Sequence, residues 1–134
     1  MNRFIRGFTL IELMVVVAIL AIIVAIGYPS YRNQVMKARR ADGKAFLLEI
    51  ADRQERYYAD QSTYTTTITD LGFDDAIATD GYYQAVITDD PTGDLKLSYT
   101  ITVTPIGTQQ DDRCAWFKVD SQGGRTASPA DCWE

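Results

Sequence analysis

The sequence predicts an α+β fold, in which a long N-terminal helix packs on a small antiparallel sheet and a C-terminal disulfide closes a loop. Three observations support this class. An uncharged apolar run extends from Leu13 to Gly27, a helical pattern follows it, and later segments carry strand patterns. With 134 residues, the chain has room for one small domain after the apolar run.

The apolar segment is long enough to cross a membrane as a helix. From Phe8 to Tyr28 such a helix would measure about 31 Å, which matches the hydrocarbon core of a bilayer. In a removable secretory signal a cleavage site follows the apolar region, whereas here Gly7 precedes it. Glu12 lies near the start of the segment, and an unpaired carboxylate in hydrocarbon costs about 2 kcal/mol or more. We therefore expect Glu12 to have a partner inside the membrane; the alternative is an interfacial position that reaches water.

The residues around Gly7 form a specific pattern, because Phe8, Thr9 and Glu12 follow it in register. They resemble the class III signal of type IV pilins, in which a prepilin peptidase cuts after the glycine and methylates the new terminus. The resemblance implies a cleaved leader at residues 1–7, N-methylation of Phe8 and a subunit-docking role for Glu12. It also implies a transmembrane and filament-core helix at residues 8–28 and a periplasmic pilin domain at residues 29–134. A plain signal anchor is the alternative.

Basic residues lie on both sides of the apolar segment. Arg3 and Arg6 precede it, and four more follow it, namely Arg32, Lys37, Arg39 and Arg40. Their count alone would favour a cytoplasmic C-terminal domain. Two cysteines favour an oxidising compartment, however, and the class III resemblance implies a cytoplasmic leader. We therefore expect a single pass through the inner membrane with a periplasmic C-terminus before assembly, and a place in a cell-surface pilus afterwards.

A second helical pattern runs from Tyr31 to about Tyr58. Pro29 lacks an N–H and its ring crowds the carbonyl of Ala25, so we expect a kink there. The two helical parts are expected to form one long helix. Small apolar residues form a stripe on the second part, with larger ones beside it: Val35, Ala38, Ala41, Ala45 and Leu48, then Phe46, Ile50 and Tyr57. The stripe should pack closely on a sheet and, in a filament, also on other helices.

Strand patterns follow a connecting loop at residues 60–81, in which a short turn is expected near Leu71. Residues 82–88 are aromatic and β-branched, residues 89–94 supply a turn, and residues 95–103 alternate apolar and polar side chains. Residues 114–120 predict a third strand, and residues 121–124 turn the chain back. These segments predict an antiparallel meander on the second half of the helix.

Cys114 and Cys132 enclose a short terminal loop. A disulfide across such a loop contributes about 3 kcal/mol in the chain-entropy model. Two free thiols or a metal pair are the alternatives, but the sequence has no histidine and the spacing fits no zinc pattern. A C-terminal disulfide also resembles the pilins. The closer resemblance is to the minor pilin group typified by PilE and ComP, through Gln54–Tyr58, Tyr64–Thr65 and Cys132–Trp133.

The composition argues against an enzyme and against a general nucleic-acid binder. The formal net charge is −5, and losing Arg3 and Arg6 with the leader lowers it by two to −7. Such acidity opposes phosphate binding. Without histidine the usual general base is missing, and pairing the cysteines removes the best nucleophile. We expect no catalytic residue, no cofactor and no metal, and we interpret acidic pairs such as Asp89–Asp90 as turn residues.

These features predict a structural minor pilin of the type IV pilus, incorporated into or priming the filament, with roles in assembly, twitching motility and adhesion. The expected partners are other major and minor pilins, prepilin peptidase, the inner-membrane assembly platform and membrane lipid. One alternative is a type II secretion pseudopilin. The other is a competence pilin that binds DNA through Arg113, Lys118 and Arg125 around the disulfide loop, because local charge can outweigh the total charge.

Overall fold

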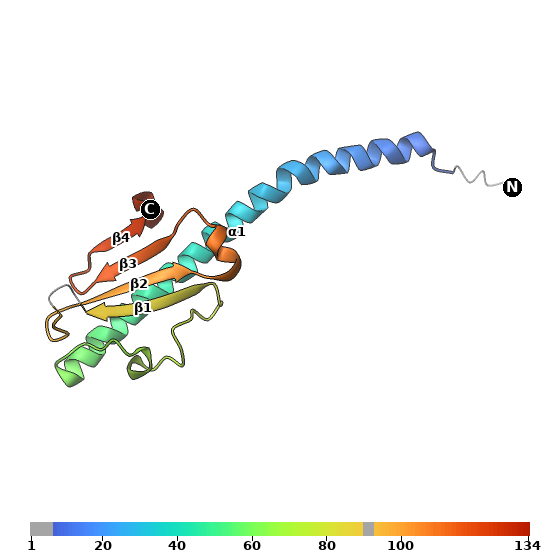
Figure 1. The fold of residues 1–134 in the computed structure, drawn as a ribbon. Helices are drawn as coiled ribbons and strands as arrows, with labels where there is room; N and C mark the ends of the chain where they lie inside the picture. The colour runs from blue at the N-terminus through green and yellow to red at the C-terminus, as the bar shows by residue number, and fades with distance from the viewer. Residues whose placement is uncertain (1–6, 90–92) are drawn as a thin grey trace. The chain divides into compact units, whose positions relative to one another are not determined.

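A computed structural model gives the fold and describes residues 7–89 and 93–134 (Figure 1). The described chain forms two compact units that meet between Val35 and Met36. Helix α1, Leu10–Gln61, contributes its first part to one unit and its second part to the other. The basic leader residues Arg3 and Arg6 and the central part of the turn expected at residues 89–94 lie outside the described residues.

The first unit consists of the N-terminal part of α1 and the short segment before it. The backbone N–H of Glu12 donates to the Thr9 hydroxyl at 3.3 Å, which satisfies one free donor of the first turn. All side chains from residue 7 to residue 34 are exposed. By length and composition, α1 contains a stretch that can cross a membrane, as the sequence predicted. Pro29 lies inside α1, and the kink expected there stays a prediction.

The second unit combines the rest of α1 with a four-stranded antiparallel sheet. The strands follow the chain order β1-β2-β3-β4, with β1 at Tyr83–Asp89, β2 at Tyr99–Pro105, β3 at Trp116–Asp120 and β4 at Arg125–Ser128. Within this unit α1 crosses one face of the sheet (Figure 1). The predicted α+β class, with a helix on an antiparallel meander, is confirmed.

The core lies between α1 and the inner face of the sheet. Alternate strand residues point inward because successive side chains of a strand face opposite sides. The buried set comprises Tyr83, Ala85 and Ile87 of β1, Tyr99, Ile101 and Val103 of β2, Phe117 and Val119 of β3, and Phe46, Leu47 and Ile50 of α1. Gly43 lets the helix approach β1, since an added Cβ would lie 2.8 Å from the Tyr83 ring. The sheet and the helix are therefore fitted to each other at a glycine.

The sheet packs on a different face of α1 from the predicted stripe. Phe46, Leu47 and Ile50 are buried, whereas the small residues Ala41 and Ala45 are exposed. Both faces carry apolar residues at helical spacing, and the larger side chains bury more apolar area. The expectation that the alanine stripe contacts the sheet is therefore wrong.

Strand limits also differ from the predicted ones. Leu95 and Leu97 precede β2 in a turn, and the Leu97 N–H donates to the Asp94 carbonyl at 3.0 Å. Strand β3 begins at Trp116 instead of Cys114, and the segment after the turn at residues 121–124 forms a fourth strand that no pattern indicated. The short turn expected near Leu71 is present as a 3-10 helix, Ile68–Leu71.

Candidate interaction surfaces

The N-terminal signal residues lie at the start of α1. Gly7 and Phe8 precede the helix, and both are exposed. Glu12 lies in the first helical turn, where the positive end of the helix dipole favours a carboxylate. Cleavage after Gly7, methylation of Phe8 and docking through Glu12 all remain predictions. This segment therefore presents an exposed apolar helix and one acid near its start.

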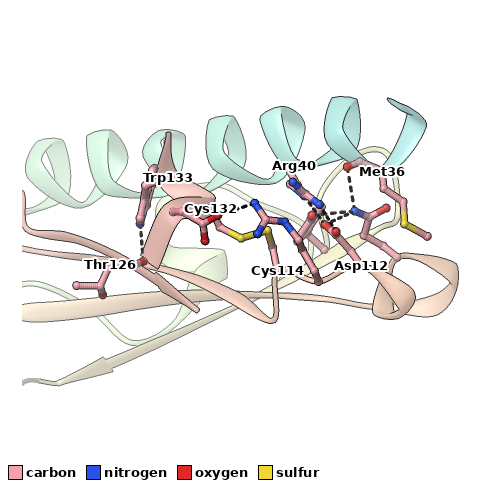
Figure 2. Close-up of a disulfide and its surroundings, with 11 residues drawn as sticks. Met36, Arg40, Asp112, Cys114, Thr126, Cys132 and Trp133 are labelled. Carbon is pink, nitrogen blue, oxygen red and sulfur yellow. Dashed lines mark hydrogen bonds and ion pairs between the residues drawn. A yellow bond between two sulfur atoms is a disulfide. The ribbon is translucent and has the colours of Figure 1, made fainter. Parts of the chain in front are cut away.

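The C-terminal disulfide joins Cys114, two residues before β3, to Cys132 in the last described turn, as the sequence predicted. Cys114 and Cys132 are bonded and buried (Figure 2). Cys132 lies in the 3-10 helix η3, Ala130–Trp133, which follows β4. The bridge therefore holds the last turn of the chain against the sheet.

Trp133 occupies a fixed place beside this bridge. Its indole N–H donates to the carbonyl of Thr126 on β4 (Figure 2). Its ring packs edge-on against Phe117 of the core, with 5.8 Å between ring centroids. A tryptophan held by a backbone hydrogen bond and an aromatic contact keeps one orientation.

Two cations lie near the Trp133 ring. The Lys44 Nζ of α1 is 5.5 Å from the ring centroid, and the guanidinium carbon of Arg125 on β4 is 5.7 Å from it. Both distances are within the range of cation–π attraction. Burial lowers the pKa of the Lys44 amine, and the charge of Arg40 lowers it further. Lys44 thus carries a partly desolvated charge at the edge of the domain.

Lys118 lies on the outer face of the sheet, opposite to the face of Arg125, because Arg125 pairs with Val119 and successive side chains alternate. It pairs with Thr126 of β4, next to Arg125, and its Nζ is 5.1 Å from the ring of Trp116. Among the described residues, no salt bridge joins a carboxylate to Lys44, Lys118 or Arg125. We call Lys44, Arg125 and Trp133 the cation–tryptophan surface; Lys118 and Trp116 lie on the opposite face of the sheet.

The structure corrects the predicted set of DNA-contacting residues. Lys118 and Arg125 lie on neighbouring strands, but Arg113 forms an ion pair with Asp131, with 2.8 Å between Nη2 and Oδ2. Its charge is therefore balanced within the chain. Lys44 was missed, because it belongs to a basic helical stretch that is distant in sequence from the disulfide loop. Only the folded helix brings Lys44 to Trp133.

Charge is distributed unevenly along the domain. Between Arg56 and Lys96 the sequence contains eight aspartates and no lysine or arginine. Several of these aspartates fold the loop, because Asp75, Asp80 and Asp94 accept hydrogen bonds from backbone N–H groups two residues later. The acidic total is therefore concentrated in the region around β1, away in sequence from β4 and the disulfide. A locally positive surface is compatible with an acidic chain.

Comparison with known proteins identifies the family. Residues 29–118 match the family model described as type IV minor pilin ComP, DNA uptake sequence receptor. Residues 2–28 match the prokaryotic N-terminal methylation motif. The chain belongs to the type IV pilins, within the ComP-like minor pilin group. Proteins of this family are structural subunits rather than enzymes.

Individual relatives agree with this family. A fimbrial protein of Pseudomonas aeruginosa is 33% identical over 104 residues, which cover 72% of this chain and 68% of that protein. The type IV major pilin protein PilA of Myxococcus xanthus is 34% identical over 68 residues, which cover 51% of this chain but only 31% of that protein. A type IV pilin structure from Shewanella oneidensis has a TM-score of 0.54 and 25% sequence identity, and the match covers 74% of this chain and 98% of that one.

Proposed function

We propose that this chain is a minor pilin that enters a type IV pilus through α1 and presents its sheet domain on the filament. The observation that carries the proposal is the first part of α1, whose side chains are exposed from residue 7 to residue 34 although most are apolar. Exposed apolar area of this extent needs a membrane or a protein partner. A bilayer covers it before assembly, and neighbouring pilin helices cover it afterwards.

Glu12 favours the transfer of α1 from the bilayer into the filament. In the first step that we propose, prepilin peptidase removes residues 1–7 and leaves a methylated amine at Phe8. An isolated carboxylate in hydrocarbon is costly, and a cation beside it reduces that cost. The Phe8 amine of a neighbouring subunit can supply the cation at one axial register. A buried polar pair of this kind fixes register in other helical assemblies.

Mass spectrometry of sheared pili tests this function. We expect the chain in the pilus fraction, with other pilins, and with Phe8 as its first residue. The Gly7→Val variant should stay uncut and in the membrane, because the side chain obstructs the peptidase. Absence of the native chain from sheared pili, or its co-purification with secretion-system components instead, would contradict a pilus function. A mature Phe8 terminus in the valine variant would contradict cleavage after Gly7.

Capture of DNA is a second candidate function, and one specific observation favours it. The matching family model is described as a DNA uptake sequence receptor. The cation–tryptophan surface supplies two cations that can meet phosphates, Lys44 and Arg125, and Lys118 supplies a third on the other face of the sheet. Lysine and arginine contribute most of the affinity for a nucleic-acid backbone. The net charge of the chain opposes such binding, so we expect weak or no duplex binding at a salt concentration of about 0.15 M.

A gel shift with the full chain in detergent, at stated salt, separates the two functions. The test variant replaces Lys44, Lys118 and Arg125 with alanine. A matched control replaces Arg56, Lys96 and Arg113, which removes the same charge elsewhere. Submicromolar binding that the test variant loses and the control keeps would make DNA capture the main function. Equal loss in both variants would indicate a dependence on net charge alone.

A further inference from the structure

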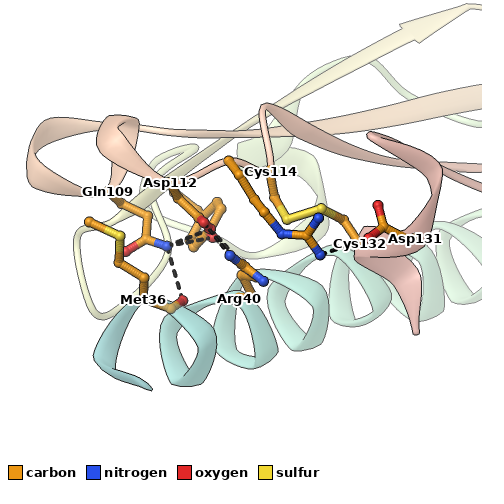
Figure 3. Close-up of polar contacts among 9 residues, drawn as sticks. Met36, Arg40, Gln109, Asp112, Cys114, Asp131 and Cys132 are labelled. Atoms are coloured by element: carbon orange, nitrogen blue, oxygen red, sulfur yellow. Dashed lines mark hydrogen bonds and ion pairs between the residues drawn. A yellow bond between two sulfur atoms is a disulfide. The ribbon is translucent and has the colours of Figure 1, made fainter. Parts of the chain in front are cut away.

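Helix α1 enters the sheet domain at a group of polar contacts. Met36 is the first buried residue of the helix. Gln109, in the 3-10 helix η2 (Gly107–Asp111), and Asp112, directly after it, meet the helix there (Figure 3). Both residues contact the first turn of α1 that is buried in the domain.

Arg40 and Asp112 form the charged part of this group. The Arg40 Nε donates to Asp112 Oδ2 at 2.6 Å, and Nη2 donates to Oδ1 (Figure 3). The Asp112 side chain is 1% exposed. Burial alone would raise the pKa of the Asp112 carboxyl, but the hydrogen bonds and charge of Arg40 and the N–H groups of Cys114 and Arg113 lower it overall. Asp112 is therefore charged in the folded domain at neutral pH.

Gln109 forms the second part and reaches the helix backbone. It is fully buried, and its Nε2 donates to the Met36 carbonyl and to Asp112 Oδ2, both at 3.1 Å. The Tyr83 hydroxyl is also 3.1 Å from this nitrogen, so the two amide N–H groups are shared among three acceptors. Burial raises the pKa of Tyr83 to about 12, so this hydroxyl is neutral at physiological pH. The Met36 carbonyl is thus held by a group outside its own helix.

The part of the helix before Met36 is less stabilised by its residue types and by burial. Gly27 and Pro29 both disfavour a helical interior, the first through backbone entropy and the second through its missing N–H. Side chains from residue 10 to residue 34 are exposed in the described chain. Unwinding that begins near Pro29 therefore uncovers little buried side-chain area until it reaches Met36.

We propose that Met36, Arg40, Gln109 and Asp112 form a clamp that stops unwinding of α1 at Met36. Continuing past this residue would break the Gln109–Met36 hydrogen bond and remove the Arg40 charge from a buried carboxylate, and both losses cost free energy. The clamp acts within a single chain, whether or not that chain enters a filament. Its effect is that the N-terminal part of α1 can bend or melt while the sheet domain stays folded.

Hydrogen exchange of the full chain in detergent micelles tests the clamp. In the native protein we expect fast exchange near residues 27–35 and a sharp rise in protection from Arg40, whose N–H is the helical partner of the Met36 carbonyl. Asp112→Asn and Gln109→Met should each speed exchange at residues 40–44 by about tenfold more than at residues 50–61, where only the loss of global stability acts. The protection boundary then moves about one turn into the domain.

Leu71→Ala is the matched control, because Leu71 is a core residue outside the clamp. This variant should speed exchange throughout the domain without moving the boundary. If Asp112→Asn unfolds the domain, Gln109→Met, which conserves side-chain size, decides the result. Three results would overturn the proposal. Protection in the native chain could rise at a position other than Arg40, or the position of this rise could stay unchanged in Gln109→Met. The Leu71→Ala control could also show the same shift as the clamp variants.

Discussion

The two parts of α1 belong to one helix of 52 residues but meet different surroundings. The first part, to Val35, contains Glu12 and a long apolar stretch, and its side chains from residue 7 to residue 34 are exposed. The second part, from Met36, contributes Phe46, Leu47 and Ile50 to the core and Arg40 to an ion pair.

The two parts of α1 therefore place different requirements on their residues. In the second part, side chains contact the chain's own sheet, so a substitution there should change the stability of the domain. In the first part, they are chosen for surroundings outside the chain, so a substitution should change insertion or assembly instead. The predictions below test that separation.

The largest effect is expected at Glu12, in the first part. Glu12→Ala removes the charge that favours docking with a neighbouring amine. An unpaired carboxylate costs about 2 kcal/mol or more, which corresponds to about tenfold or more in an equilibrium. We expect at least a comparable fall in the amount of the chain in sheared pili, measured by immunoblot against the membrane fraction.

Two controls accompany this variant. Leader cleavage and domain stability should stay at native levels, because Glu12 is exposed and lies far from the sheet in sequence. Glu12→Asp should be intermediate, since the charge remains but the side chain is shorter. Native-level entry of the alanine variant into pili would reduce Glu12 to an interfacial residue.

The next effect concerns the second part alone. Cys132→Ser removes the bridge that holds η3 and Trp133 against the sheet, and loss of such a bridge costs roughly 2–5 kcal/mol. Urea unfolding followed by tryptophan fluorescence measures this loss, because Trp116 and Trp133 both report on the sheet domain. A simultaneous drop in sheared pili without loss of stability would contradict the separation between the two parts.

Local patterns predicted much of this architecture. The membrane-length run, the signal residues around Gly7 and the pairing of Cys114 with Cys132 depend on composition and on short spacing. The first and third strands were placed within two residues of their limits, because aromatic and β-branched residues cluster there. Strand β4 was missed because its four residues include no cluster of aromatic and β-branched side chains. Arg125, Thr126 and Ser128 were interpreted as part of a turn.

Contacts between distant segments were beyond sequence reasoning. Arg40 and Asp112 are 72 positions apart, and the sequence marked Arg40 only as one of several basic residues. Lys44 meets Trp133 for the same reason, through the packing of the helix on the sheet. Two apolar faces on α1 left the choice of core face open, and the larger side chains decided it. The position of Arg113 near the disulfide was correct, but its ion pair with Asp131 was not foreseen.

The same substitution in each part of α1 should have opposite effects. At Gly43 an added Cβ would lie 2.8 Å from the Tyr83 ring, so Gly43→Ala should destabilise the domain by about 1–3 kcal/mol. At Gly27 an added Cβ meets nothing within 4 Å, so Gly27→Ala should strengthen the helix by up to about 1 kcal/mol. Urea midpoints measure the first change, and far-ultraviolet circular dichroism in detergent measures the second. Destabilisation at both glycines would show that the first part also packs on the domain.

A last effect is a dependence on acid that only the second part should show. Arg40 and the neighbouring backbone N–H groups lower the pKa of Asp112 in the folded domain despite its burial. The folded domain therefore binds a proton at Asp112 less readily than the unfolded chain does. The stabilisation is complete above the unfolded pKa of about 4 and is lost as the pH falls through the lower folded value.

Asp112→Asn removes this contribution at neutral pH, where we expect a loss of about 1.5 kcal/mol, the lower end for a hydrogen bond to a charged group. Arg40 remains partly in water, so it does not become a fully buried unpaired charge. Because Asp112 in the native chain loses its charge in acid, the difference between the two unfolding free energies should shrink as the pH falls below about 4. Urea unfolding of both chains between pH 7 and about pH 2.5 measures that difference. A constant difference across this range would mean that the asparagine costs stability through packing, and that the charge of Asp112 does not hold α1 to the sheet.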